Sequence, residues 1–225
     1  MNNYKLETKK FWKNEIKKHV MLYPDERVVA FISKYYKEQD NSNKNALDLG
    51  FGSGRNLIPL LDNGFNSYGI DYNEECCKIA KKILKNRNNL KELYNNDIRD
   101  INFEEGFFDV VINNGISVLV TNDEFIENLK NIHKIMKKGG KMFVNFRTKD
   151  DFLFGKGEKL DEYSFKLDER AKEYSGGLYS FYSYEEAERL IVSTGFKVLN
   201  CERKELWKNG LEDKNKWWIF SVECI

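Results

Sequence analysis

The sequence predicts an α/β fold in which a mostly parallel sheet carries helices on both faces. Short apolar runs of strand length alternate along the 225 residues with longer segments whose apolar residues recur at helical spacing. A glycine-rich turn separates the first of these strands from the helix that follows it. Strands that alternate with helices of this length are joined by right-handed crossovers, which make the strands parallel and place helices on both sides of the sheet.

The expected elements follow in chain order. Helices are expected first, over residues 6–20 and from Pro24 onwards. Strands are expected at the short apolar runs 45–49, 66–70, 91–94, 107–112, 141–146, 196–201 and 216–223. The helices between them are expected from the glycine-rich turn to about residue 62, and over 73–87, 122–136 and 184–194. Pro59 lies inside the first of these at some cost, Asn73 can cap the second, and Gly139-Gly140 is expected to end the third.

One domain is expected over residues 1–225, because a chain of this length can bury a core of its own. Residues 1–40 are expected to form an N-terminal helical cap on it. Residues 148–183 break the alternation and are rich in glycine and aromatic residues. A long irregular segment inside a compact domain is typical of a lid, so this segment is expected to close over a bound molecule.

Charge and cysteine content exclude several classes of protein. Lys and Arg total 37 against 36 for Asp and Glu, and the lysines are scattered, so a nucleic-acid partner is not expected. No apolar run reaches the ~18 residues of a membrane span, and the N-terminus lacks the apolar region of a signal peptide, so neither a membrane partner nor export is expected. The four cysteines form no Cys-x-x-Cys pair, so no metal is expected. The protein is expected to be cytoplasmic, with its cysteines as reduced thiols.

The sharpest motif is Asp48-Leu49-Gly50-Phe51-Gly52-Ser53-Gly54, which follows the strand at 45–49 and opens a helix. Glycines there allow a tight turn and let a ligand approach the backbone, while the helix N-terminus offers free N–H groups. Asp71 stands at the end of the next strand, where a carboxylate can accept both hydroxyls of a ribose. The alternative is a structural glycine turn followed by a helix-capping aspartate.

The glycine spacing selects among nucleotide cofactors. A dinucleotide fingerprint that begins at Gly50 requires Gly or Ala at position 55, where this chain has Arg55. The third glycine is Gly54, and Asp48 lies two residues before the first. This E/DxGxGxG form resembles the first motif of the class I S-adenosylmethionine-dependent methyltransferases. The resemblance runs from about residue 44 to the C-terminus. It implies a Rossmann-like doubly wound sheet of seven strands, S-adenosyl-L-methionine as cofactor and S-adenosyl-L-homocysteine as product.

The resemblance also implies which residues bind the cofactor. By this resemblance Asp71 meets the ribose, and Asp97 with the amide of Ile98 meets the adenine. Asn113-Asn114 ends the strand that normally faces the methyl group. The segment IHKIMKKGGKMFV is similar to the family's next helix and strand, although Lys138 stands where a proline is usual. The cofactor-binding set is therefore expected to be Asp48, Gly50, Phe51, Gly52, Gly54, Asp71, Tyr72, Asp97, Ile98 and Asn113.

The expected acceptor is a small molecule. The segments MLYPDERVVAF and RTKDDF…GKGEKL resemble a bacterial subgroup that modifies small molecules or surface sugars, which implies a sugar or another hydroxyl or amine acceptor. Its candidate binding residues are Tyr23, Asn114, Arg147, Tyr179 and Phe181. Arg147 has two interpretations: it holds a carboxylate or phosphate of the acceptor, or it forms an ion pair with Asp150 or Asp151.

Catalysis consists mainly of aligning a nucleophile with the methyl group, and some acceptors also need a proton acceptor. Only two histidines are present. His133 falls within an expected helix and is interpreted as structural, whereas His19 is the candidate catalytic base, with a plain surface role as the alternative.

Other functions remain open at this point. A protein or nucleic-acid methyltransferase is one, although Asn113-Asn114-Gly115-Ile116 lacks the prolines of the amino methyltransferases. A nicotinamide-dependent oxidoreductase is opposed by Arg55, and a catalytically silent adenosylmethionine-binding module is the alternative that is not an enzyme. The protein is expected to be a monomer or a homodimer.

Overall fold

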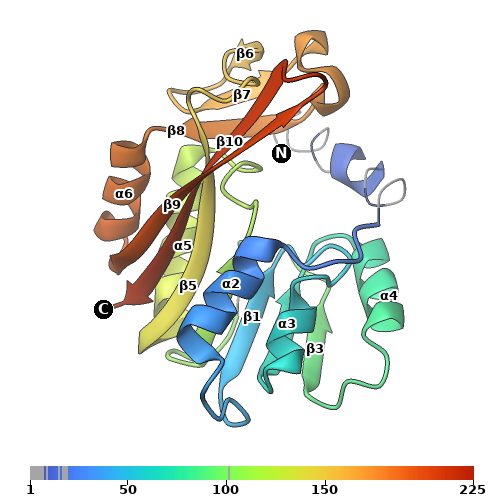
Figure 1. Cartoon of the computed structure of the whole chain (residues 1–225), viewed down its shortest axis with the longest axis vertical. Helices are drawn as coiled ribbons and strands as arrows, with labels where there is room; N and C mark the ends of the chain where they lie inside the picture. The colour runs from blue at the N-terminus through green and yellow to red at the C-terminus, as the bar shows by residue number, and fades with distance from the viewer. Residues whose placement is uncertain (1–7, 9, 15, 17–19, 101) are drawn as a thin grey trace.

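The computed structural model describes residues 8, 10–14, 16, 20–100 and 102–225. They form an α/β fold around one central sheet (Figure 1). Its helices are α2 (Glu26–Tyr36), α3 (Leu57–Asp62), α4 (Glu74–Ile83), α5 (Asn122–Ile135), the 3-10 helix η1 (Glu169–Tyr174) and α6 (Tyr184–Ser193). Its strands are β1 (Asn45–Leu49), β2 (Asn66–Ile70), β3 (Leu90–Tyr94), β4 (Phe108–Asn113), β5 (Met136–Thr148), β6 (Gly157–Lys159), β7 (Ser164–Leu167), β8 (Leu178–Tyr182), β9 (Phe196–Lys208) and β10 (Asp213–Cys224).

The expected seven-stranded sheet is present as the order β3-β2-β1-β4-β5-β10-β9. Its first five strands are parallel, and β10 is antiparallel to both β5 and β9. The alternation of strands and helices therefore predicted the parallel part correctly. The antiparallel part is a long β9–β10 hairpin that crosses in front of β5 (Figure 1).

The segment 148–183 is not irregular, which corrects the expectation of a structureless lid. It contains β6, β7, η1 and β8, and these three strands extend the sheet to ten. β5 continues past the last residue of β4, and its final residues Arg147 and Thr148 pair in parallel with β8. Phe165, Tyr179 and Phe181 of this segment, which is called the lid below, pack in an apolar cluster with Leu153, Leu167, Ala171 and Val118.

Several expected boundaries were wrong. α5 ends at Ile135 and β5 begins at the next residue, so Gly139 and Gly140 lie inside a strand rather than ending the helix. α4 ends at Ile83, not near residue 87. Pro59 is the third residue of α3, within the first turn, where its missing N–H has no helical partner to lose. The two C-terminal strands are longer than expected because each continues into the hairpin.

Two apolar clusters cover the two faces of the sheet. One joins β1, β4 and β5 to α5 and α6, and the other joins the same strands to α2, α3 and α4. Alternate residues of β5 take opposite sides: Val144 and Phe146 belong to the first cluster, and Phe143 belongs to the second. This alternation also sends Asn145 and Arg147 toward the second face, at the end of the strand.

Candidate active site

A cavity of about 680 Å³ lies at the carboxyl ends of the parallel strands, where open α/β sheets bind ligands. Two groups of residues line it. The loop half consists of lining residues that follow the strands, in the segments 50–53, 71–73, 97–99 and 114–116. The sheet half consists of side chains on one face of β5, β10 and β9, faced by Trp12 and by the lid residues Tyr174, Leu178 and Tyr179.

The glycines of the loop half make room for a ligand. Gly50, Gly52 and Gly54 have φ angles of 62°, 56° and 83°, which side-chain-bearing residues rarely adopt. A Cβ on Gly50 would lie 2.5 Å from Ile116 Cδ1, so the Ile116 side chain would have to shift, and the positive φ of Gly50 would strain a side-chain-bearing residue as well. A Cβ on Gly52 would meet nothing within 4 Å, because it would project into open space. Gly52 therefore borders the cavity, whereas Gly54 packs against α4 and does not line it.

Asp71 organises this loop. Its carboxylate accepts backbone hydrogen bonds from Gly52 and Asn73, each at 2.9 Å. Burial raises the pKa of Asp71 above its usual range, and these two N–H groups act in the opposite direction. The Cys76 thiol also bonds to this carboxylate, which has about four acceptor sites, so capacity remains for a ligand hydroxyl. The neighbouring Tyr72 lines the cavity as well.

Asp48 lies behind the loop and does not line the cavity. Its side chain is buried, and among the described residues its Oδ2 has no hydrogen-bond partner. Burial raises the pKa of Asp48 well above the ordinary range. A buried carboxyl without a full set of partners costs stability, so its presence points to a demand other than packing.

Asp97 and Ile98 both line the cavity, but Asp97 is engaged by a residue that the sequence did not single out. Arg99 donates to both of its oxygens, from Nε at 2.8 Å and from Nη2 at 2.7 Å. The same guanidinium reaches Glu124 of α5 at 3.2 Å. This clamp holds the segment after β3 against α5, and Arg99 and Glu124 themselves line the cavity.

The two asparagines after β4 differ in placement. Asn113 is fully buried, does not line the cavity, and has neither amide atom paired within the described structure. Asn114 does line it and accepts a hydrogen bond from Asn145 Nδ2 at 2.7 Å. Asn145 Oδ1 in turn accepts from the Gly115 N–H at 2.7 Å. Asn145 thus fixes the chain after β4, at the junction of the loop half and the sheet half.

Arg147 is buried, and the expected partner Asp151 is present at 2.7 Å from Nη1. Nη2 donates to Asn215 Oδ1 at 3.0 Å. The rings of Tyr174, Tyr179 and Trp217 surround the guanidinium, with centroids 5.4, 5.3 and 4.8 Å away. The ion pair is therefore internal rather than on the surface. The cluster around Arg147 joins the lid to β10, and Arg147 also lines the cavity.

Of the three remaining expected acceptor residues, Tyr23, Tyr179 and Phe181, only Tyr179 lines the cavity. Tyr179 is buried and lines the cavity. Phe181 is fully buried in the lid core, and the side chain of Tyr23 is 83% exposed, so neither reaches the cavity. His19 lies outside the described residues. His133 is on α5, where its ring packs edge-on against Phe196, in agreement with its structural interpretation.

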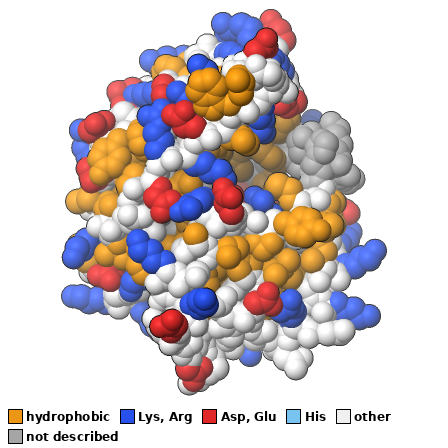
Figure 2. Space-filling view, viewed as in Figure 1, with side chains coloured by type: hydrophobic (Ala, Val, Ile, Leu, Met, Phe, Trp, Pro, Cys, Tyr) orange, Lys and Arg blue, Asp and Glu red, His pale blue; other side chains and the backbone are white. Residues whose placement is uncertain are grey.

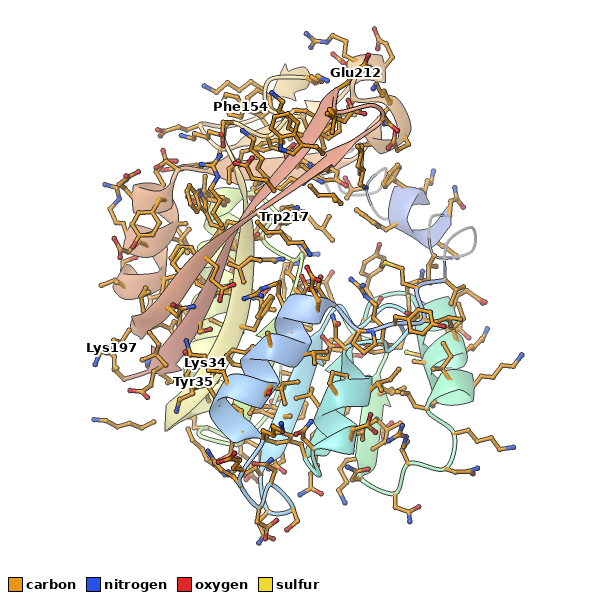
Figure 3. All side chains as sticks on the ribbon, viewed as in Figure 1. Lys34, Tyr35, Phe154, Lys197, Glu212 and Trp217 are labelled. Atoms are coloured by element: carbon orange, nitrogen blue, oxygen red, sulfur yellow. The ribbon has the colours of Figure 1, made fainter. Side chains whose placement is uncertain are left out.

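Sequence reasoning missed most of the sheet half. Phe143, Asn145 and Arg147 alternate along β5, and Ile219, Trp217 and Asn215 alternate along β10. The register pairs Trp217 with Arg147 and Ile219 with Asn145, so these side chains form one continuous face. β9 adds its lining residues Lys204, Leu206 and Lys208. Trp217 lies in the middle of the hairpin, between the lid and α2 (Figure 3).

The central part of the chain matches a known family. Residues 47–144 match the family described as a methyltransferase domain. A protein of Bacillus subtilis (strain 168) named as a methyltransferase, YqeM, is 31% identical over 96 residues. That alignment covers 42% of this chain and 38% of the relative, so it includes less than half of either protein.

Solved structures share the fold over a greater length. A SAM-dependent methyltransferase of Methanosarcina mazei superimposes with a TM-score of 0.67 at 18% identity, over 84% of this chain and 95% of that one. The 1,6-didemethyltoxoflavin-N1-methyltransferase of Burkholderia thailandensis, solved with 1,6-didemethyltoxoflavin and S-adenosylhomocysteine, gives a TM-score of 0.63 at 14% identity, over 88% and 77%. These likenesses establish the class I methyltransferase fold.

Two other kinds of feature are absent from the described residues. No cluster of three or more His, Cys, Asp or Glu side chains suited to a metal ion occurs among them. Within the same residues, no helix is long and apolar enough to cross a membrane. Lysine, arginine and acidic side chains are interspersed over the face shown in Figure 2.

Proposed function

Since residues 47–144 match the family described as a methyltransferase domain, we propose that the protein transfers the methyl group of S-adenosyl-L-methionine to a small-molecule acceptor. The observation that carries the proposal is the division of one cavity into two unlike halves. The loop half has the features of a nucleoside site, and the sheet half is a separate compartment that begins where the loop half ends, at Asn114 and Asn145.

The residues of the loop half fit this cofactor. Gly52 leaves open space beside its Cα, and Asp71 has acceptor capacity to spare at the end of β2. Burial favours the neutral form of Asp48 in the ligand-free chain, and a cationic ligand in the loop half would favour its ionised form. In this proposal Asp71 and Tyr72 hold the ribose and Ile98 and Asp97 border the adenine. The bound cofactor supplies an electrophilic methyl carbon on a sulfonium.

A small-molecule acceptor is supported by enclosure of the sheet half. Trp12 lines it from the N-terminal segment, and Tyr174 and Tyr179 line it from the lid. The N-terminal segment is also attached to the glycine loop, because Ser53 Oγ donates to the Met21 carbonyl and Asn56 Oδ1 accepts from the Asp25 N–H. A compartment covered from two sides suits a molecule that enters whole, rather than a site on a large polymer.

The contribution of the chain to the reaction is alignment and exclusion of water. Asn145 holds the Asn114–Gly115 segment by two hydrogen bonds, so the boundary between the halves has a fixed position. The aromatic side chains of the lid remove water from the acceptor side, which strengthens polar contacts made there. Such positioning can be worth several kcal/mol of the barrier.

Calorimetry with purified protein tests the cofactor half of the proposal. We expect S-adenosylhomocysteine to bind with one site per chain and NAD not to bind. A turnover assay that measures S-adenosylhomocysteine release then tests the acceptor half, with a small-molecule extract compared with nucleic acid and denatured protein. Binding of NAD alone, or turnover only with a polymer, would overturn the proposal.

A further inference from the structure

The charged residues of the cavity are unevenly distributed between its halves. Four acids of the described residues line the cavity, and each interacts with a residue in or next to the loop half. Asp71 accepts from the Gly52 N–H, and Asp97 and Glu124 pair with Arg99. Asp25 lies 4.0 Å from Arg55. The lining charges of the sheet half are Arg147, Lys204 and Lys208, and no acid of the described residues lines that half. The acceptor side of the cavity therefore carries positive charge.

The three cations are not equally engaged. Arg147 is neutralised by Asp151 inside the protein. Lys204 is paired with Glu26, whose side chain is 72% exposed, so that pair is weakened by water. Lys208 has no ionic partner among the residues that the structure describes; the nearby Asp213 is taken by Lys172 at 2.8 Å. Lys208 thus offers an unneutralised charge at the rim, near the hairpin tip that Glu212 marks in Figure 3.

An aromatic cage that would suit a cationic acceptor is already filled. Tyr174, Tyr179 and Trp217 enclose the Arg147 guanidinium, so they present no empty site to an ammonium group. Between Arg147 and Lys208 the register places Trp217 and then Leu206, with Asn215 opposite Leu206, on the same face. Trp217 and Leu206 are the apolar side chains of this stretch. This surface matches a flat or apolar body about the size of an aromatic ring.

We propose that the methyl acceptor is an anion, in which an apolar, ring-sized body rests on Trp217 and Leu206 and a carboxylate or phosphate group binds Lys208, with Lys204 adding to the local potential. This inference rests on the proposed function and narrows its substrate class. It disfavours cationic amines as acceptors.

The test uses the full-length protein saturated with S-adenosylhomocysteine and four ring-sized probes. Benzoate and phenyl phosphate carry the two anionic groups, while benzyl alcohol and benzylamine are the neutral and cationic counterparts. Ligand-observed NMR gives the dissociation constant of each. We expect at least one anion to bind at least tenfold more tightly than the alcohol or the amine, and the stronger of the two anions identifies the group. Equal or tighter binding of the alcohol or amine, or failure of both anions to bind at millimolar concentration, would overturn the inference.

Two lysine variants separate the site from general charge. Lys208→Gln should weaken the preferred anion about fivefold, the upper range for a partly exposed ion pair, and leave benzyl alcohol unchanged. Lys214→Gln removes the same charge from the same hairpin, where Lys214 lies over the Trp207 ring and does not line the cavity, and should have no effect. Equal loss in both variants would show only a diffuse field. Absence of S-adenosylhomocysteine binding at the outset would instead contradict the proposed function itself.

Discussion

The loop half and the sheet half of the cavity are built on different principles. The loop half is made of short segments in which neighbouring residues satisfy one another, as where Asp71 binds the N–H groups of Gly52 and Asn73. The sheet half is made of alternate residues on three strands, which only register brings together. The first arrangement holds one ligand shape by backbone geometry, and the second can change its ligand through side chains alone. Under the proposed function, the backbone of the fold determines the cofactor, and the side chains of the β9–β10 hairpin determine the acceptor.

The largest expected effect concerns the sheet half. Asp151→Ala leaves the buried Arg147 charge without a carboxylate and should lower the free energy of unfolding by about 3–5 kcal/mol. Asp150→Ala is the control, since that carboxylate is half exposed and should cost no more than about 1 kcal/mol. Urea denaturation measures both. Similar losses in the two variants would mean that the Arg147 cluster does not hold the lid to β10.

A second substitution, Gly52→Val, alters the loop half and leaves the sheet half unchanged. Gly52→Val places a side chain in open cavity space and should lower S-adenosylhomocysteine affinity by roughly 3 kcal/mol or more, through steric exclusion and the positive φ. Gly64→Val shares the positive φ and the open surroundings but lies outside the cavity. Calorimetry with the Gly52→Val and Gly64→Val variants should separate ligand exclusion from backbone strain. Unchanged S-adenosylhomocysteine affinity in Gly52→Val would show that the cofactor does not bind at this loop.

Asp71 gives a graded test of the same half. Asp71→Ala removes a charged acceptor for ribose hydroxyls and should weaken S-adenosylhomocysteine binding by about 1–3 kcal/mol. Asp62→Ala, on the exposed end of α3, should bind normally. Unaltered affinity in Asp71→Ala would leave Asp71 with only its role in the turn.

The smallest expected effect is a gain in stability. The pKa of Asp48 is raised in the folded state, so the native protein binds more protons than the unfolded chain at pH values between the ordinary carboxyl pKa and the raised one. Stability therefore falls as pH rises through that window. Asp48→Asn removes this loss and should stabilise the ligand-free protein by on the order of 1 kcal/mol at neutral pH, with the advantage vanishing toward pH ~4. Thermal unfolding of both proteins at several pH values measures the stability difference. A difference that does not change with pH would show that the pKa of Asp48 is not raised in the folded protein.

The same contrast explains what could be predicted from the sequence. The segment 48–54 and Asp71 were identified because glycine spacing and an acid at a strand end are local signals, and the structure brings Gly50, Gly52 and Asp71 to one cavity. The clamp of Arg99 on Asp97 was missed because a surface-like arginine two residues from an acid carries no distinctive pattern.

Longer-range features were beyond sequence reasoning. Nothing in the strand at 216–223 indicates that Trp217 pairs with Arg147, since that depends on hairpin register. The lid was expected to be irregular because its strands are short and their pairing is with one another and with the end of β5. Phe181 illustrates the difficulty, because its neighbour Tyr179, on the same side of the strand, reaches the cavity while Phe181 fills the lid core.

The interior position of β10 has a consequence for biosynthesis. β10 lies between β5 and β9, although it is the last of these strands to be made on the ribosome. Residues 45–113 hold β1 to β4 and can pair while synthesis continues, so the loop half can assemble early. Arg147 meets Trp217 and Asn215 only after translation has passed β10. A nascent chain stalled before residue 213 would therefore present a nearly finished cofactor site beside an open edge of β5, which exposes the sheet to pairing with another chain.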